Sequence, residues 1–208
     1  MRELARIGVL AAILMLACTG TREPTSPLSP ADSPDYAVYD ALLDGLFGEG
    51  AVPGAPPRYV IGDSTVFGGG SEQDFAHLRF QQQFGPLLFP LVAEMRADHV
   101  ARNRVRVPLD PRSFRARGRV EVVSARTLET LRGAAPDLDA YWRSYHARFP
   151  GASGRITFSR PGYDAAGTHA LLSYGHHCGG RCGDWGYVLL ERREGTWVVV
   201  RRVITTVS

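Results

Sequence analysis

The chain has 208 residues, of which 44% are hydrophobic, so length and composition suit one folded domain with a real core. The formal net charge is only +3, and the N-terminal segment contributes +1 of it, from Arg2 and Arg6 against Glu3. The charge that remains is too small to indicate a nucleic-acid-binding protein.

The N-terminus has the pattern of a secretory signal. Basic residues precede the apolar run 7–17, which is too short to span a bilayer, since a span takes about 20 apolar residues. The string Leu14-Met15-Leu16-Ala17-Cys18 resembles the lipobox of bacterial lipoproteins, in which the Cys becomes the lipid-carrying N-terminus. We therefore expect residues 1–17 to be a lipoprotein signal peptide and Cys18 to be the site of lipid attachment. The alternatives are a plain signal peptide with an incidental Cys and an uncleaved anchor.

The residue after the lipobox bears on location. Thr19 follows the Cys, whereas Asp at this position is the usual retention signal in bacteria with two membranes. We expect an exported, membrane-anchored protein on the periplasmic face of the outer membrane, if the cell has one. Residues 18–34 are rich in Pro, Ser and Thr and predict a lipid-anchored tether, which leaves residues 35–208 as a single domain.

Helices dominate the first part of this domain and strands the last. Apolar residues at helical spacing predict helices over 33–47, 71–84, 90–103 and 137–149. Residues rich in β-formers predict strands over 58–67, 119–124, 155–160, 169–177, 187–193 and 196–207, with a Gly-rich loop over 178–186 and a turn at Glu194-Gly195. The predicted class is α+β, with N-terminal helices packed on a C-terminal antiparallel β-meander. We expect one face of the sheet to be covered by the helices and the other to be partly in water.

A locally basic stretch lies between two predicted elements. It contains Arg102, Arg104, Arg106, Arg112, Arg115, Arg117 and Arg119. Such a stretch could contact anionic lipid or polysaccharide, or it could be an ordinary solvated surface. Because only one aromatic residue, Phe114, lies among these Arg residues, the stretch does not have the composition of a nucleic-acid-binding surface.

The last third of the chain carries an ordered pattern of Gly, Cys and aromatic residues. The pattern comprises Trp142, Phe149-Pro150-Gly151, Ser159-Arg160-Pro161-Gly162-Tyr163, Ala170-Leu171, Cys178-Gly179-Gly180-Arg181-Cys182-Gly183, Leu189-Leu190, Gly195, Trp197-Val198 and Ser208, with Arg102-Asn103 as a further match. It resembles a family of uncharacterised bacterial exported proteins, although Pro161 and Tyr163 stand where Val and Phe are expected. The resemblance implies one exported α+β domain and supplies no activity.

The segment 176–184 is the strongest candidate site. If Cys18 carries lipid, Cys178 and Cys182 remain as an even pair, and an oxidising compartment favours a disulfide between them. Alternatively, His176, Cys178, Cys182 and Asp184 could bind zinc or copper. A redox enzyme is less consistent with the sequence, because the spacing is Cys-x-x-x-Cys and no strand-to-helix context follows.

The sequence contains no complete catalytic motif. It lacks a Gly-x-Ser-x-Gly elbow, a His-Glu-x-x-His pair, a phosphate loop and a dinucleotide fingerprint. We therefore expect a lipid-anchored cell-envelope protein that binds or supports another envelope protein or polymer, with no catalytic residues and no cofactor. The alternative is a metal-binding or thiol-redox protein centred on residues 176–182.

Overall fold

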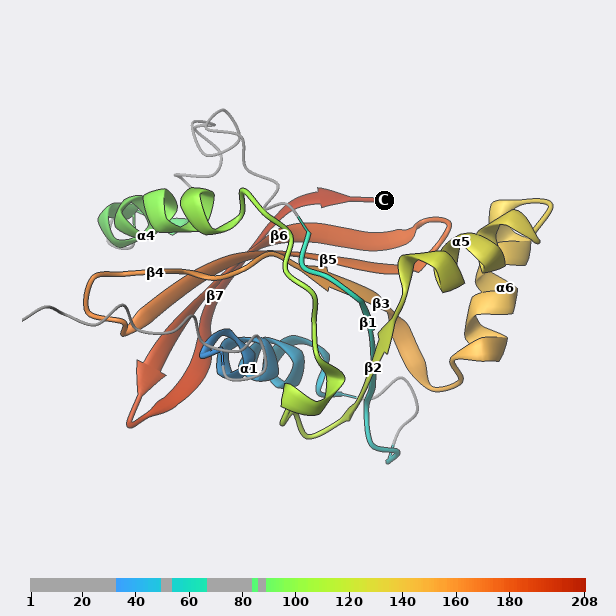
Figure 1. Cartoon of the computed structure of the whole chain (residues 1–208), viewed down its shortest axis with the longest axis horizontal. Helices are drawn as coiled ribbons and strands as arrows, with labels where there is room; N and C mark the ends of the chain where they lie inside the picture. Colours follow the sequence, from blue (N-terminus) through green and yellow to red (C-terminus); the bar gives the residue numbers. More distant parts are fainter. Residues whose placement is uncertain (1–32, 50–53, 67–83, 86–88) are drawn as a thin grey trace, which may run out of the picture.

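The computed structural model describes residues 33–49, 54–66, 84–85 and 89–208 (Figure 1). Its helices are α1 (Asp35–Phe47), α4 (Phe89–Arg102), α5 (Ala125–Gly133) and α6 (Leu138–Arg148), with a short 3₁₀ helix η2 (Pro111–Ser113). Its strands are β1 (Arg58–Gly62), β2 (Arg119–Val123), β3 (Ala152–Phe158), β4 (Gly162–Tyr163), β5 (His169–Gly179), β6 (Cys182–Arg193) and β7 (Thr196–Val207). The α+β class is confirmed.

The strands form one mixed sheet. Their order is β2-β1-β3-β5-β6-β7, with β4 paired to β5. Strands β5, β6 and β7 form the antiparallel meander that the sequence predicted. The turn at Glu194-Gly195 has φ angles of 50° and 85°, as a two-residue hairpin turn requires. Strand β1 runs parallel to both β2 and β3, a feature the predicted meander did not include, and α5 and α6 form the connection from β2 to β3.

Helix α1 covers one face of the sheet. It begins at Asp35, two residues after the predicted start, with Pro34 at the N-cap position, and Ser33 Oγ accepts a hydrogen bond from the N–H of Asp35 at 3.3 Å. Its apolar stripe is buried in the largest core cluster, where the ring of Tyr39 stacks on Phe158 at 4.2 Å between centroids. Burying such a stripe, which includes the fully buried Leu42, stabilises the fold through the hydrophobic effect.

The opposite face is covered by helices at its two ends. Helix α4 packs through Val92 on Leu171 of β5, and helix α6 packs through Tyr145 on Val60 of β1. The prediction of a single helix-covered face was therefore wrong, because apolar side chains from the same strands point to both sides. In Figure 1, α4 lies above one end of the sheet and the α5–α6 pair lies beyond the other end. The middle of this face, over β3, β5 and β6, lies between them.

Several element boundaries differ from the predictions. The strand predicted over 58–67 ends at Gly62, and the chain then pairs Ser64 with Pro108. The loop predicted over 178–186 is instead the tip of the β5–β6 hairpin, because β6 already begins at Cys182. Helix α5 was not predicted; it has nine residues, of which only Leu128 is buried. The helices predicted over 90–103 and 137–149 are confirmed to within about one residue at each end. Residues 71–83, where another helix was predicted, lie outside the described residues.

Candidate functional site

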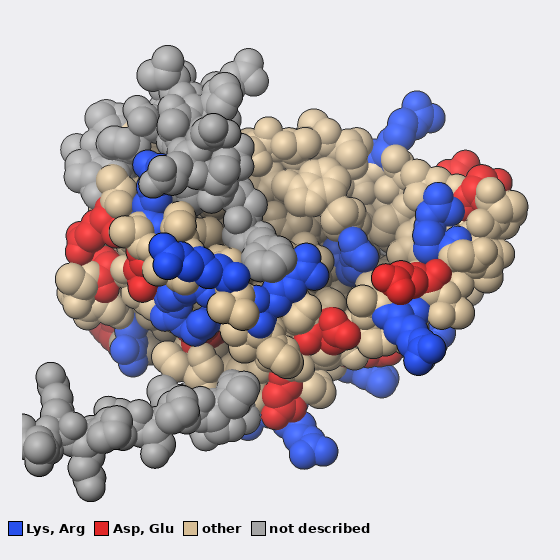
Figure 2. All heavy atoms as spheres, turned by 45° about the horizontal axis from the view of Figure 1, so that its top comes forward, with Lys and Arg blue, Asp and Glu red and all other residues tan. Residues whose placement is uncertain are grey.

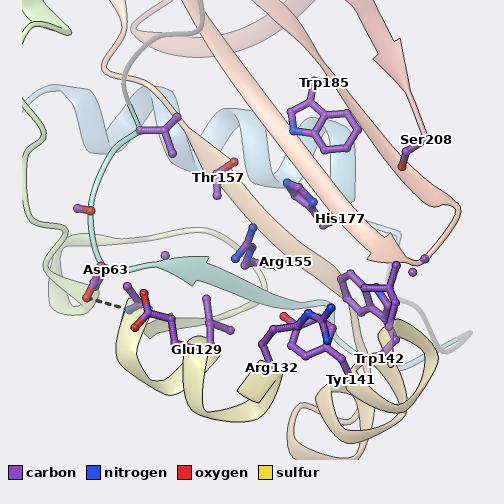
Figure 3. A pocket seen from close by; sticks show the side chains of 18 of the residues that line it. Asp63, Glu129, Arg132, Tyr141, Trp142, Arg155, Thr157, His177, Trp185 and Ser208 are labelled. Carbon is purple, nitrogen blue, oxygen red and sulfur yellow. Dashed lines mark hydrogen bonds between the residues drawn. The ribbon is translucent and has the colours of Figure 1, made fainter. Parts of the chain in front are cut away.

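A groove opens on the face of the sheet opposite α1. It has a volume of about 580 Å³ and lies between the sheet and the α5–α6 pair (Figure 3). A smaller hollow of about 330 Å³ adjoins it and shares Arg155, Thr157, His177 and Trp185 with it. We call the two together the groove. Its size falls in the range of small-molecule sites, roughly 300–1,000 Å³.

The floor of the groove is built by alternate residues of three adjacent strands. Arg155 on β3 is paired with His177 on β5, and in the next row Thr157 is paired with Gly175, which is itself paired with Trp185 on β6. Because side chains alternate along a strand, these residues share the face that points away from α1. Figure 3 shows the side chains of Arg155, Thr157, His177 and Trp185 directed into the groove.

Gly175 leaves room for the indole of Trp185. A Cβ atom at Gly175 would lie 2.7 Å from Cδ1 and 2.8 Å from Nε1 of Trp185, so the ring lies across β5 at this point. The indole also meets the His177 ring edge-to-face, with centroids 4.6 Å apart. A side chain at Gly175 would push the ring away, and glycine at this position therefore sets where the aromatic surface lies.

Arg155 is the principal charge on this floor. Its Nε atom is buried and has no hydrogen-bond partner, and no carboxylate among the described residues forms an ion pair with it. His177 is the other titratable group there. Burial first, and then the charges of Arg155 and His176, lower the pKa of His177 to about 4. The imidazole is therefore neutral at pH 7, and the floor carries one fixed positive charge beside an aromatic ring.

Helices α5 and α6 form the wall of the groove. Tyr141 and Trp142 on α6 line it with their buried rings, and the guanidinium of Arg132 on α5 lies 6.0 Å from the centroid of Tyr141. Glu129 lines the same wall and is exposed. At the rim, Asp63 accepts a hydrogen bond at 3.3 Å from the N–H of Ala125, the first residue of α5, while Ser124 caps the helix through the N–H of Thr127.

The tip of the β5–β6 hairpin closes one end of the groove. Cys178 and Cys182 form a disulfide there, as predicted, and Gly179 and Gly180 line the groove. The tip lies against α6, because Nε2 of His146 is 3.3 Å from the carbonyl oxygen of Cys178. The disulfide thus fixes part of the boundary of the groove.

The alternative metal site is not assembled. Both Cys residues are in the disulfide, and the described residues contain no group of three or more His, Cys, Asp or Glu that could hold a metal ion. His176 lies on the α1 face, as its register with respect to His177 requires, and its ring packs on Phe47 at 4.9 Å. Asp184 accepts hydrogen bonds from Tyr174 and Arg202, although one of its oxygens also lies 3.7 Å from Nδ1 of His176.

A buried polar network brings together other residues of the pattern described for the last third. The carboxylate of Asp35, which is 3% exposed, accepts hydrogen bonds from Arg102 at 2.7 Å, Arg160 at 3.2 Å and the hydroxyl of Tyr163 at 3.0 Å. Asn103 bonds to both the N–H and the carbonyl of Arg160. These contacts join α1, α4 and the β3–β4 connection, so we assign these residues a structural role.

One Ser–His pair occurs in this network, away from the groove. Nε2 of His99 lies 2.9 Å from Oγ of Ser159. Both residues are almost fully buried, at 1% and 0% exposure, and burial lowers the pKa of His99 to about 4. Ser159 Oγ also accepts a hydrogen bond from the N–H of Ser173. A substrate could not reach this hydroxyl in the folded domain, so the pair is not a nucleophilic site.

The basic stretch between residues 102 and 119 is divided between internal and surface roles. Arg102 pairs with Asp35, Arg117 lies 3.4 Å from Asp44, and Arg115 donates to the carbonyl of Phe114 at 2.8 Å. Figure 2, which brings the upper face of Figure 1 forward, shows basic side chains spread across the molecule with acidic ones between them. We therefore assign no ligand to this stretch.

Sequence reasoning did not single out the floor of the groove. It gave no role to Arg155, Thr157, His177 or Trp185. The sequence did carry one signal of this floor: the polar Arg155 and Thr157 alternate with the apolar Ile156 and Phe158, which indicates a strand with one polar face. A polar floor shared by several strands can be recognised only when the pairing register of the strands is known, because the register decides which residues of neighbouring strands lie side by side.

No protein-family model, curated protein or solved structure matches the chain, so the resemblance described above stays a prediction. Among the helices in the described ranges, none is long and apolar enough to cross a membrane.

Proposed function

We propose that this chain is a lipid-anchored cell-envelope protein whose folded domain binds a small ligand in the groove without catalysing a reaction. One observation carries the binding part of the proposal. The groove of about 580 Å³ presents the indole of Trp185 beside the charge of Arg155, and this charge has no acidic partner among the described residues. A concave site with aromatic walls and a few convergent polar groups is the usual form of a ligand site.

The chemistry of the groove supports binding more than catalysis. Thr157 is one hydroxyl on the floor, and its Oγ1 faces the carbonyl of Gly175 at 3.5 Å. His177 meets the ring of Trp185, and among the described groove residues it makes no hydrogen bond to a hydroxyl that it could activate. Nucleophilic catalysis needs such a hydroxyl–base pair. The Ser–His pair at Ser159 is buried elsewhere in the fold.

The anchor part of the proposal rests on the sequence. The lipobox-like string ends at Cys18, and the Pro/Ser/Thr-rich residues 18–34 lead directly to α1, which begins at Asp35. A tether of this length and composition would keep the groove within reach of the membrane surface.

Metabolic labelling tests the anchor. Cells that express the full-length chain are grown with radiolabelled palmitate, and the label on the chain and its presence in the membrane fraction are measured. We expect a labelled, membrane-bound chain, and we expect Cys18→Ala to abolish the label. An unlabelled wild-type chain would refute the lipid anchor and leave the groove unaffected.

Calorimetric titration tests binding. All described helices and strands lie between residues 35 and 207, so a chain that starts at Thr19 retains each of them. We expect 2-naphthamide, a neutral probe with a flat ring, to bind saturably with one site per chain. Trp185→Leu should weaken binding at least about fivefold, since stacking on an aromatic side chain contributes roughly 1–3 kcal/mol. Trp197→Leu is the matched control, because Trp197 packs on the α1 face near Tyr163. If neither 2-naphthamide nor 2-naphthoate binds, the groove is not a ligand site.

A further inference from the structure

Building on the proposed function, we infer that the ligand of the groove carries an oxyanion, such as a carboxylate or a phosphate. Arg155 binds this group, and a flat or apolar part of the ligand packs on Trp185. The inference names the class of ligand and the residue that selects it. It depends on three features of the groove: an unmatched cation, the absence of a competing charge on the floor, and a fixed aromatic surface.

The unmatched cation distinguishes Arg155 from the other partly buried Arg residues. Arg58 pairs with Glu121 at 2.5 Å, Arg102 and Arg160 pair with Asp35, and Arg202 pairs with Asp184. Arg155 sits in the middle of β3 and has no such pair among the described residues; its Nε, like those of Arg58 and Arg102, is buried without a hydrogen-bond partner. The Arg155 side chain is only partly buried, and an incoming anion would give its buried Nε the acceptor that the fold does not supply.

The groups around Arg155 leave this role open. The acidic side chains that line the groove are Asp63, which accepts a hydrogen bond from the N–H of Ala125, and Glu129, which is exposed on the wall; the basic residues Arg106 and Arg132, also exposed, line it away from the floor. Neither acidic side chain is ion-paired with Arg155. Beside it, the imidazole of His177 offers a hydrogen bond without adding a second fixed charge at pH 7. A planar guanidinium can donate two parallel hydrogen bonds to a carboxylate or phosphate, which fits an oxyanion better than a single acceptor.

The aromatic surface lies close enough to act on the same ligand. Arg155 on β3 is paired with His177 on β5, and the centroids of the His177 and Trp185 rings are 4.6 Å apart. Figure 3 shows the three side chains along one side of the groove, with Tyr141 and Trp142 further along the wall. A small molecule with an anionic end and a flat body could therefore contact the cation and the indole together.

Calorimetry with matched probes tests the inference on the chain from Thr19. The probes are 2-naphthoate, 2-naphthyl phosphate and the neutral 2-naphthamide, which share one ring system. We expect at least one of the two anions to bind at least about tenfold more tightly than the amide, as a charge-assisted hydrogen bond implies. Which anion binds better tells a carboxylate ligand from a phosphate ligand. This comparison needs no variant, so it stands even if a substitution disturbs folding.

Variants assign the preference to one residue. Arg155→Gln should remove the tenfold difference between anion and amide, whereas Arg155→Lys should keep part of that difference. Arg143→Gln removes the same charge from the exposed surface of α6, outside the groove, and should leave the difference intact. Equal affinity for all three probes would overturn the inference and leave the proposed function standing. A preference that Arg155→Gln and Arg143→Gln reduce equally would also overturn it, because it would then reflect net charge alone. The absence of binding by every probe would refute the proposed function itself.

Discussion

Substituting Gly175 by Ala should disturb the groove more than the core. The new Cβ would lie 2.7 Å from Cδ1 of Trp185 and 2.9 Å from Oγ1 of Thr157. Carbon atoms at optimal contact are about 3.5–4.0 Å apart, so the indole would have to move by about 1 Å. Overpacking of this kind costs about 1–3 kcal/mol, and replacing Gly within a strand returns roughly 0.5–1 kcal/mol. We expect a net loss of about 1 kcal/mol in the free energy of unfolding.

Two measurements check this prediction together. Urea unfolding followed by tryptophan fluorescence gives the loss in stability, and calorimetry with 2-naphthamide gives the loss in affinity, which should be several-fold. Gly133→Ala is the matched control, because a Cβ at this last residue of α5 meets nothing within 4 Å. It should leave stability equal or slightly higher and binding unchanged. If Gly175→Ala matched the wild type in both stability and affinity, the close approach of Trp185 to β5 would be wrong.

Three further predictions concern stability. Asp35→Ala should destabilise the chain by about 3 kcal/mol in urea unfolding, because it leaves a buried network of Arg side chains without its acceptor. The control Glu191→Ala breaks an exposed ion pair and should cost under about 1 kcal/mol. Similar losses in the two variants would contradict a structural role for the network. Replacing Cys178 and Cys182 together by Ser should cost about 2 kcal/mol by loop-closure entropy. Reductant should lower the stability of the wild type by a similar amount and leave the stability of the variant unchanged; an equal effect on both would contradict the prediction. Burial lowers the pKa of His99 from 6.5 to about 4, so an unfolded chain binds more protons between these values and stability falls as pH drops through this window. Between pH 7 and pH 5 the loss from His99 should be about 2 kcal/mol, and a His99→Gln variant that loses stability as steeply as the wild type would contradict it.

The sequence was informative where a pattern is local. The helices α1, α4 and α6 follow apolar stripes with helical spacing, and the hairpin at Glu194-Gly195 follows the turn preference of its residues. The Cys178–Cys182 disulfide followed from cysteine counting and short spacing. In each case, the information lies within a few neighbouring residues.

The rest depends on contacts between distant segments. The parallel pairing of β1 with β2 and β3 joins strands that are far apart in the chain, and no local signal fixes it. For the same reason Arg155 and Trp185 could not be placed side by side, since their distance is set by the register of three strands. His176 and Asp184 do lie near each other, as the metal hypothesis required, but Arg202 and Tyr174 reach Asp184 from positions that the sequence did not connect with it.

The most direct test of the groove as a ligand site is a two-dimensional ¹H–¹⁵N NMR titration of the tryptophan-labelled chain with 2-naphthoate. The three Trp residues report on different places, because Trp142 and Trp185 line the groove while Trp197 packs on the opposite face. The indole N–H signal of Trp185 should shift most, that of Trp142 less, and that of Trp197 not at all, with each signal assigned from a Trp→Phe variant. Unmoved groove signals, or a shift confined to Trp197, would contradict the proposed function.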